Sequence, residues 1–404
     1  MTVIECFTDS HIDNISACLR LQPEKVIMVG CASQMQIPVE RYQHFLQNRG
    51  QHTQILLSDT EGKDFPEICH VLYRLALQEE DCVIDLTGGD ERIIMAVGAV
   101  MANLSSQQRQ HIQIQKYDHQ AEVLLDCMNE NAPIPSKMPT LTVEELITLH
   151  GGSLYPKATE LPADCNHKDV DQLWHLVTVD PKSWNRSITL LNEFESRSDS
   201  KMQIFVPLYY LRHSIKDFEA KTLLIRELLD KLHRWGVIIN QSDDHALNYT
   251  YRSPLLRYCT LKAGNVLEVK TLLAGRAALE QGKPFFQNCA MSVSIDWDGV
   301  IHGFADRVVD TRNEIDVILM HGTTPLFISC KNGNVGEEEL YKLSTVADRF
   351  GGPHVRKMLI ATELDSKNLV ANQQRAWDMD IVLIPNAADL SQEELQRRFV
   401  HALK

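Results

Sequence analysis

Short continuous apolar runs alternate with longer helix-periodic segments over roughly the first 120 residues. The runs "VIECFT", "KVIMVGC", "TQILLS", "CVIDLTGG" and "HIQIQKY" predict strands, and "SHIDNISACLRL", "VERYQHFLQNR", "FPEICHVLYRLALQ" and "ERIIMAVGAVMANL" predict the helices between them. Continuous apolar strands are typical of a sheet whose two faces are both covered by helices. Strand–helix alternation of this kind predicts a doubly wound parallel sheet, the core of an α/β domain over residues 1–140.

The pattern weakens after this domain. Residues 128–140, "MNENAPIPSKMPT", carry prolines and little periodicity, which predicts a linker. In residues 141–250 the clearest element is "AKTLLIRELLDKLHRWGVI", an amphipathic helix that Gly236 is expected to end. A helix followed by a short strand resembles a winged-helix fragment. No basic recognition helix accompanies it, so we prefer the plainer interpretation, a packing helix in a linking region.

The residues from 251 to 404 predict a third unit, again of the α/β class. "GNVLEVKTLLAGRAALEQ" has helical periodicity, and "MSVSIDWDG", "NEIDVILMHG" and "PLFISCKNG" are three successive strands separated by turn residues. "EEELYKLSTVADRF" is a helix that ends at a Gly-Gly pair, and "RKMLIAT" and "DIVLIP" add two strands. We expect a C-terminal α/β domain that is separate from the first sheet.

Composition narrows the class of protein. The 404 residues fit two or three domains, and 44% hydrophobic with 23% charged residues is an ordinary globular balance. No segment approaches the ~18 apolar residues that span a bilayer. The first residues lack a basic stretch, so we expect no signal peptide. Ten cysteines without zinc-ligand spacing predict reduced thiols in a cytoplasmic protein. A net charge of −14 argues against general electrostatic binding to duplexes, but a nuclease with local basic groups is compatible with it.

Three strand ends of the first domain carry small and polar residues. These are "FTDSH" (7–11), "GCASQ" (30–34) and "DLTGGDE" (85–91). Ligands bind at the carboxyl ends of strands in open α/β sheets, and glycines with helix N-terminal amides suit phosphate groups. The plain alternative for the third segment is a Gly-Gly turn with Asp90 as the helix N-cap. The sequence has neither GxGxxG nor a Walker A lysine, which argues against dinucleotide binding and NTP hydrolysis.

A second set of chemical groups lies in the C-terminal domain. If "NEIDVILM" and "PLFISCK" pair as a hairpin across "HGTTP", Asp316 and Lys331 converge, since alternate side chains share a face. A carboxylate that binds a divalent cation beside an ammonium group is typical of metal-assisted phosphodiester hydrolysis. Glu268 on the preceding helix adds a carboxylate, and such hard oxygen ligands suit Mg²⁺ or Mn²⁺. The plain alternative is a cross-strand surface pair of little energetic consequence.

These segments carry a family resemblance over nearly the whole chain. "NEIDVILMHGTTPLFISCKNG" with the following "EEELYKLSTVADRFGG" is similar to the catalytic core of PD-(D/E)xK nucleases, and "DLTGGDE" resembles the ligand motif of Rossmann-like CARF domains. The two together resemble ancillary nucleases of type III CRISPR antiviral defence. The resemblance implies a homodimer that binds a cyclic oligoadenylate between two CARF domains. Cyclic tetra-adenylate is favoured over cyclic hexa-adenylate as activator, and the nuclease domains cleave DNA or RNA with a divalent metal, Mg²⁺ or Mn²⁺.

The resemblance also implies roles for particular residues. The ligand pocket is expected to be lined by Thr8, Asp9, Ser10, Ser33, Thr87, Gly88, Gly89 and Asp90. The catalytic residues are expected to be Glu268, Asp316, Ser329 and Lys331. The metal is expected to rest on Glu268, Asp316 and the backbone carbonyl of Cys330, with Glu314 in reserve.

One position departs from the family pattern. Ser329 stands where the family has its second acid, and a hydroxyl is a poorer metal ligand than a carboxylate. This favours an alternative, a nucleotide-sensing signalling or binding protein with a degenerate nuclease domain. A third hypothesis, a ring nuclease that degrades its own activator, ranks last because no histidine or lysine in the three loops stands out as a general acid or base.

Overall fold

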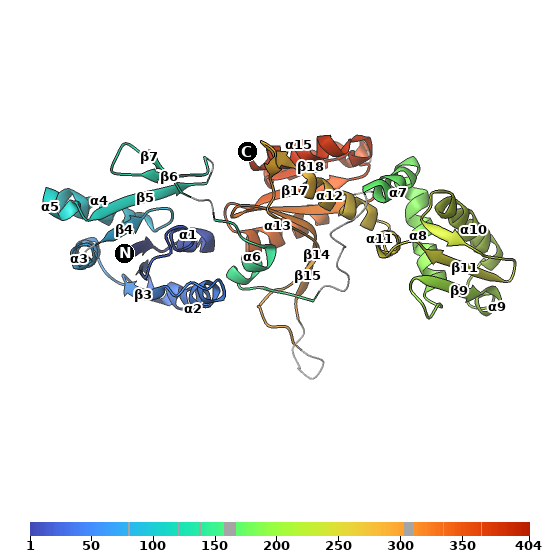
Figure 1. Cartoon of the computed structure of the whole chain (residues 1–404), viewed down its shortest axis with the longest axis horizontal. Helices are drawn as coiled ribbons and strands as arrows, with labels where there is room; N and C mark the ends of the chain where they lie inside the picture. Colours follow the sequence, from blue (N-terminus) through green and yellow to red (C-terminus); the bar gives the residue numbers. More distant parts are fainter. Residues whose placement is uncertain are drawn as a thin grey trace.

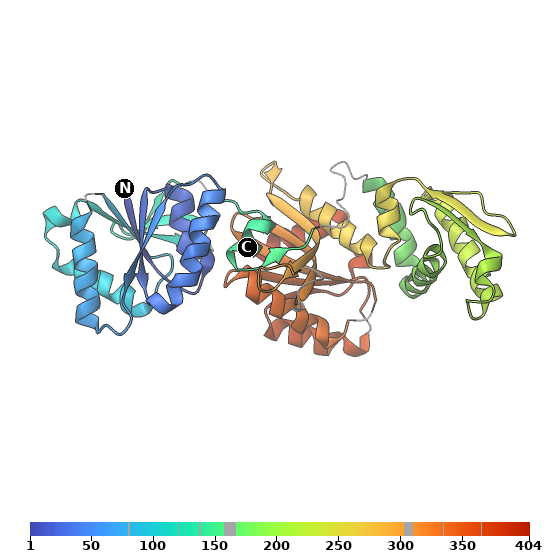
Figure 2. The same ribbon diagram turned by 90° about the horizontal axis from the view of Figure 1, so that it is seen from below.

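The chain forms three lobes in a row in a computed structural model (Figures 1 and 2). The structure describes all residues except 80, 120, 137–138, 157–166, 303–309, 334 and 365. The N-terminal lobe lies at one end, the C-terminal part of the sequence forms the central lobe, and the middle of the sequence forms the end lobe on the other side. The region predicted to link the other two therefore does not lie between them in space.

The N-terminal lobe contains a seven-stranded sheet in the order β3-β2-β1-β4-β5-β6-β7. Its strands are β1 (Thr2–Cys6), β2 (Lys25–Gly30), β3 (Gln54–Asp59), β4 (Cys82–Asp85), β5 (Ile112–Asp118), β6 (Val123–Asp126) and β7 (Ala132–Ile134). The first five strands are parallel. The chain adds strands in one direction from β1 to β3 and then crosses to the other side at β4, so the topological switch point lies between β1 and β4. The predicted doubly wound parallel sheet is confirmed.

Helices cover both faces of this sheet, as the continuous apolar strands predicted. They are α1 (His11–Leu21), α2 (Ala32–Asn48), α3 (Phe65–Gln78), α4 (Glu91–Asn103) and the short α5 (Ser106–Arg109). Side chains of α1 and α2 share a core with Val3 and Met28, whereas those of α3 and α4 share a core with Ile4 and Val29. Neighbouring residues of one strand thus serve opposite faces.

The end of the sheet differs from the sequence prediction. Strands β6 and β7 were not expected, and β7 lies inside the segment 128–140 that predicted a linker. Both strands pair antiparallel, β6 on β5 and β7 on β6. Their short runs sit at the sheet edge, where little apolar burial is needed, so they leave a weak hydrophobic signal in the sequence.

The end lobe is a small α/β unit. It contains α8 (Pro181–Glu195), β9 (Gln203–Pro207), α9 (Leu208–Leu211), α10 (Phe218–Arg234), β10 (Ile238–Asn240) and β11 (Ala246–Tyr251). The strands form an antiparallel sheet in the order β10-β11-β9. The long helix α10 is the predicted amphipathic helix, and Gly236 follows it with φ +70°. Helices α7 (His167–Val179) and α11 (Pro254–Cys259) join this lobe to the central lobe.

The central lobe is built on a six-stranded mixed sheet, β18-β17-β16-β15-β14-β8. Its strands are β8 (Ser153–Leu154), β14 (Asn288–Asp296), β15 (Arg312–His321), β16 (Thr324–Lys331), β17 (Arg356–Ala361) and β18 (Ile381–Ile384). Its helices are α6 (Val143–Leu149), α12 (Asn265–Ala277), α13 (Glu337–Gly351), α14 (Ser366–Asp378) and α15 (Gln392–Leu403), with η1 (Ala387–Asp389). The small ribbon β12 (Leu279–Glu280) and β13 (Lys283–Pro284) follows α12.

Each face of the central sheet is continuous with one neighbouring lobe. Apolar residues of α12 and α15 pack on one face and share a core with the end lobe. On the other face, α6 and α13 share a core that extends to α1 and α2 of the N-terminal lobe. The central lobe therefore contacts both other lobes through buried apolar surface rather than through a single flexible tether.

In the described part of the chain, no helix is long and apolar enough to cross a membrane.

Candidate functional site

The loops after β1 and β4 meet at the switch point of the N-terminal sheet. A Cβ atom added to Gly88 would lie 2.4 Å from the Thr8 Cγ2 atom, and one added to Gly89 would lie 2.6 Å from Cys6 Cβ. Gly89 also has a φ of +115°, in the left-handed region. A side chain at either position would collide with β1 or the loop that follows it, so both positions require glycine. The absence of side chains leaves the loop backbone accessible at the sheet edge where ligands of such folds bind.

Hydrogen bonds fix the shape of the loop after β1. The Thr8 amide donates to Asn14 Oδ1 (2.9 Å), and Asn14 Nδ2 donates to the Thr8 carbonyl (2.7 Å) and to the Tyr42 hydroxyl (3.1 Å). The Ser10 hydroxyl caps α1 by accepting from the Asp13 amide. The sequence interpretation missed Asn14 and Tyr42, because neither lies in a strand-end segment.

The remaining predicted ligand residues have defined positions. Thr87 Oγ1 accepts from the Tyr117 amide (2.9 Å), which ties the loop after β4 to β5. Asp90 is the N-cap of α4, which is the structural role that the sequence offered as the alternative to ligand binding. Ser33 lies in the first turn of α2, where its amide already donates to Glu61 Oε2 (3.1 Å). The loop after β2 is thus hydrogen-bonded to the carboxylate of Glu61, which follows the neighbouring strand β3.

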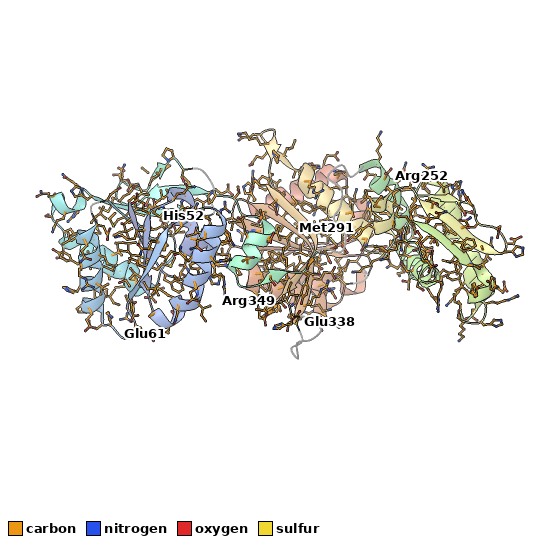
Figure 3. All side chains as sticks on the ribbon, turned by 60° about the horizontal axis from the view of Figure 1, so that its bottom comes forward. His52, Glu61, Arg252, Met291, Glu338 and Arg349 are labelled. Atoms are coloured by element: carbon orange, nitrogen blue, oxygen red, sulfur yellow. The ribbon has the colours of Figure 1, made fainter. Side chains whose placement is uncertain are left out.

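Two cavities adjoin these loops at the boundary between the N-terminal and central lobes. One, of about 500 Å³, is lined by Thr87 and Lys116 on one side and by Thr324 and Arg356 on the other. The second, of about 490 Å³, is lined by Asp9 and by residues of the central lobe. One of these is Arg349, labelled in Figure 3. The loops after β1 and β4 therefore face the central lobe across polar, partly basic cavities.

His150, at the end of α6, lies buried next to the second cavity. Its Nδ1 lies 2.9 Å from the Leu146 carbonyl. Burial lowers the pKa of His150 to about 3; the hydrogen bond to the Leu146 carbonyl opposes this shift, and the nearby Arg349 and Arg41 guanidinium groups contribute to it. His150 is therefore neutral in the folded protein at physiological pH.

The predicted hairpin in the central lobe is confirmed. β15 and β16 pair antiparallel up to His321 and Thr324, which leaves two residues in the turn. Ser329 Oγ donates to Asp316 Oδ2 (3.1 Å), the Cys330 amide donates to the same oxygen (2.6 Å), and Lys331 Nζ lies 3.8 Å from it. The structure brings Asp316 and Lys331 together at the end of β16.

Glu268 faces this strand end from α12. Its carboxylate is buried and accepts from Ser292 Oγ (3.3 Å), which in turn lies 2.7 Å from the Tyr258 hydroxyl. Burial, followed by repulsion from Asp316, raises the pKa of Glu268 to about 8. Burial also raises the pKa of Asp316, although Lys331 opposes that shift. Two partly desolvated carboxyl groups thus repel one another at this strand end.

A carboxylate that the sequence interpretation missed holds the lysine. Lys331 Nζ lies 2.9 Å from Glu339 Oε2, and the other oxygen of Glu339 lies 3.0 Å from Lys342. Burial lowers the pKa of Lys331, but the nearby carboxylates outweigh it and the net shift is upward, so the ammonium form is retained. The available signal was the position of Glu339 in the first turn of α13, the helix that follows β16.

The other predicted residues of this site lie as follows. The Cys330 thiol is buried against α12, where Sγ lies 3.5 Å from Thr271 Oγ1, while the Cys330 amide donates to Asp316. Glu314 is half-exposed and lies 3.8 Å from Lys262. A backbone carbonyl ligand from Cys330 and a reserve role for Glu314 remain predictions.

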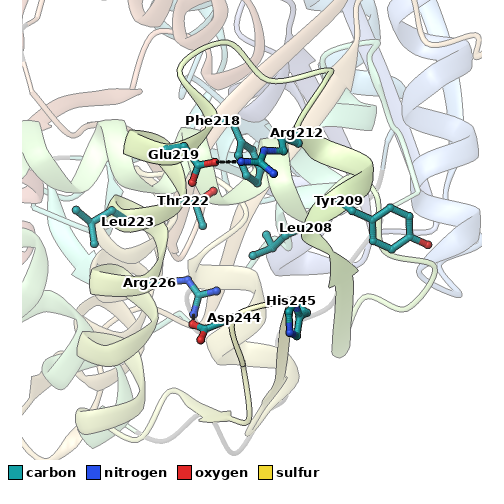
Figure 4. Close-up of a pocket in the computed structure, with 10 residues that line it drawn as sticks. All are labelled: Leu208, Tyr209, Arg212, Phe218, Glu219, Thr222, Leu223, Arg226, Asp244 and His245. Atoms are coloured by element: carbon teal, nitrogen blue, oxygen red, sulfur yellow. Dashed lines mark hydrogen bonds and ion pairs between the residues drawn. The ribbon is translucent and has the colours of Figure 1, made fainter.

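A further cavity, of about 510 Å³, lies in the end lobe (Figure 4). Two ion pairs border it, Arg212 with Glu219 (3.0 Å) and Arg226 with Asp244 (3.9 Å). None of the residues predicted for ligand binding or catalysis lines it. The chemistry predicted from sequence is therefore concentrated in the other two lobes.

Comparison with known proteins agrees with this division. Residues 261–402 match the family model "Card1-like, endonuclease domain", which confirms the predicted nuclease resemblance for the C-terminal part. The full fold is similar to protein VC1899 from Vibrio cholerae (TM-score 0.69, 16% identity, 100% of this chain and 97% of that chain). It is also similar to Can2 from Sulfobacillus thermosulfidooxidans in complex with cyclic tetra-adenylate (TM-score 0.65, 15% identity, 100% and 97%). The sequence matched no curated protein.

Proposed function

We propose that the protein is a divalent-metal-dependent nuclease that a cyclic oligoadenylate activates in type III CRISPR defence. The observation that carries the proposal is the grouping of Glu268, Asp316 and Lys331 at one strand end inside the segment that matches the Card1-like endonuclease domain. Three chemically suitable residues from one helix and two strands converge there, as metal-assisted phosphodiester hydrolysis requires.

The donor set fits a hard divalent cation such as Mg²⁺ or Mn²⁺. Glu268 and Asp316 offer carboxylate oxygens, and burial raises the pKa of each, so a bound cation would stabilise their ionised forms. Lys331 does not supply this stabilisation fully, because its charge is shared with Glu339. When bound, the cation would polarise the scissile phosphate and lower the pKa of a bound water.

The remaining groups of the site have positioning and electrostatic roles. The Cys330 amide and the Ser329 hydroxyl both donate to Asp316 Oδ2, which fixes the orientation of that carboxylate. The ion pair with Glu339 holds the Lys331 ammonium group in place before the substrate binds. Lys331 therefore loses little conformational entropy when its charge interacts with the scissile phosphate. Serine at position 329 thus orients the metal-binding carboxylate instead of binding the metal.

The N-terminal lobe supports the sensing half of the proposal. The touching loops after β1 and β4 occupy the switch point where α/β sheets bind ligands, and the Can2 structure of similar fold was determined with cyclic tetra-adenylate. We place the ring at Thr8–Ser10 and Thr87–Asp90 of two chains in a homodimer. We expect Ser33 to line the same pocket at its β2 side.

Cleavage assays test this function. Supercoiled plasmid and labelled single-stranded RNA would be incubated with the protein and Mn²⁺, with and without cyclic tetra-adenylate. We expect cutting only when metal and ring are both present, and we expect Asp316→Asn and Lys331→Met to bind the ring but not cut. Normal cutting by either variant would show that the site is misassigned.

Ser329 gives a specific reason to keep a second function, a nucleotide sensor with an inactive nuclease domain. In that case the wild type binds the ring tightly but cuts nothing, and Ser329→Glu gains activity. If Ser329→Glu instead lowers an existing activity, the serine is part of a working site. Linear products from the ring alone would point to ring-nuclease activity.

A further inference from the structure

Three side chains from distant parts of the sequence converge where the N-terminal lobe meets the central lobe. Asp13 lies in the first turn of α1, His119 directly follows β5, and His354 lies between α13 and β17. His119 Nε2 is 2.7 Å from Asp13 Oδ1, and His354 Nε2 is 3.2 Å from Oδ1 and 3.4 Å from Oδ2 of the same carboxylate. The two imidazole rings stack with their centroids 3.7 Å apart.

The positions of the donor atoms suit one metal ion. One ligand atom from each residue lies within 4.8 Å of the other two. Ligand atoms bound to zinc at about 2.0–2.1 Å lie roughly 3–3.5 Å from one another in a tetrahedral site. An ion therefore enters this group with small outward shifts of the side chains, taking the place of the two protons that otherwise join imidazole to carboxylate.

The chemistry of the three groups selects the kind of ion. Two imidazole nitrogens and one carboxylate oxygen suit zinc and similar first-row transition metals, whereas Mg²⁺ prefers oxygen ligands alone. The side chain of Asp13 is 9% exposed and that of His119 13%, so the donors are largely withdrawn from water. His119 and His354 both line the cavity of about 500 Å³, which leaves room for a water or anion as a fourth ligand.

We propose that Asp13, His119 and His354 bind one Zn²⁺ ion that fastens the N-terminal lobe to the central lobe. The site is distinct from the carboxylates of the nuclease centre. Asp13 follows the predicted ring-binding loop and lies against it, since a Cβ atom at Gly88 would be 3.4 Å from Asp13 Cβ. His354 precedes β17, whose Ala361 pairs with Lys331. The ion would thus join the element beside the sensing loop to the strand beside the lysine.

Zinc titration of the full chain tests the proposal. Chelator-treated protein in excess Mg²⁺, which occupies the hard oxygen site, would be titrated with Zn²⁺ alone against a chromophoric competitor. We expect one tight zinc per chain, and Asp13→Asn, His119→Gln and His354→Gln should each weaken it by at least about tenfold. His44→Gln, at an exposed histidine of α2, is the matched control and should bind zinc as the wild type does.

Two further measurements keep the result independent of folding and of nuclease activity. Co²⁺ bound in place of zinc should give visible absorption typical of imidazole ligation, and Asp316→Asn should retain it. Zinc should raise the melting temperature of the wild type and of His44→Gln but not of His354→Gln. No stoichiometric zinc in the wild type, equal binding by all three ligand variants, or loss only in Asp316→Asn would overturn the proposal.

Discussion

Substitution of Gly88 by alanine tests the contact between the two loops of the proposed sensing site. The φ of Gly88 lies outside the left-handed region, so its backbone accepts alanine. The obstacle is Thr8, whose Cγ2 would lie 2.4 Å and whose Cβ would lie 3.1 Å from the new methyl group. A β-branched side chain has little freedom to move aside. The loops must therefore separate, and overpacking of this kind costs about 1–3 kcal/mol.

A glycine-to-alanine substitution elsewhere in the lobe should increase the stability instead of decreasing it. Gly98 is exposed in α4, and a Cβ atom there meets nothing within 4 Å. Gly98→Ala should stabilise the lobe by up to about 1 kcal/mol, because glycine is unfavourable inside a helix. Thr8→Ser removes the obstructing methyl group and keeps the hydroxyl. In the Thr8→Ser background, the cost of Gly88→Ala should fall by roughly 1 kcal/mol or more.

The assay must report on the N-terminal lobe alone. All five tryptophans lie beyond residue 170, so tryptophan fluorescence follows the other lobes. Hydrogen exchange of peptides that cover β1 and β4, measured by mass spectrometry at increasing urea, reports the local free energy of opening. Titration with cyclic tetra-adenylate would be run on the same samples, and Gly88→Ala should weaken binding. An unchanged opening energy in Gly88→Ala, or an equal loss in both backgrounds, would refute the contact as the cause.

Three further predictions concern titration and catalysis. Below about pH 6.5 the unfolded chain binds a proton on His150, whereas the folded chain does not, because burial lowers the pKa of this residue. The free energy of unfolding should therefore fall by roughly 1.4 kcal/mol for each pH unit below 6.5. The urea midpoints measured at pH 7 and pH 5 should differ less in His150→Gln than in the wild type. Burial raises the pKa of Glu5 well above its usual value, and repulsion from Asp85 adds to the shift. The folded chain therefore keeps a proton on Glu5 that the unfolded chain releases as the pH rises through about 4.3, so the buried carboxyl group destabilises the fold above that pH. Glu5→Gln should have a higher melting temperature than the wild type at pH 8 but not at pH 4. Glu339→Gln weakens a charge-assisted hydrogen bond to Lys331 worth about 1.5–3 kcal/mol, which should lower kcat roughly 10- to 100-fold with little change in KM, and an unchanged kcat would remove Glu339 from the site.

Much of the fold could be predicted because burial dictates it. β1, β2 and β4 are buried on both faces and therefore read as continuous apolar runs, and the hairpin of β15 and β16 follows from two such runs separated by a short turn. The beginning of α2 was missed. The sequence predicts a helix only from Val39 onward, whereas α2 begins at Ala32 and contains Pro38, a residue that disfavours a helix interior. Tertiary packing of α2 on the sheet overrides the local preference.

The less predictable features depend on contacts between distant residues. Asp316 and Lys331 were found because they belong to adjacent strands with a fixed register. Asp13 and His354 are 341 positions apart, and neither belongs to a motif with regular spacing. The order of the lobes in space was equally hidden, since it depends on which face of the central sheet packs against which neighbour. Periodicity within an element carries no such information.

The arrangement of lobes limits how a signal from the N-terminal lobe can reach Lys331. β17 runs from the boundary with that lobe to the end of β16, and it lies between β16 and β18 in the central sheet. Strands that are hydrogen-bonded on both sides and packed on both faces do not slide individually, because interiors are close-packed. A displacement that reaches β17 through His354 therefore moves the central sheet as a body. Opposite His354, Asp13 belongs to α1, whose N-cap Ser10 is in the proposed ring-binding loop. The gating proposed above would thus require rotation of whole lobes, with Glu268, Asp316 and Lys331 keeping their mutual distances.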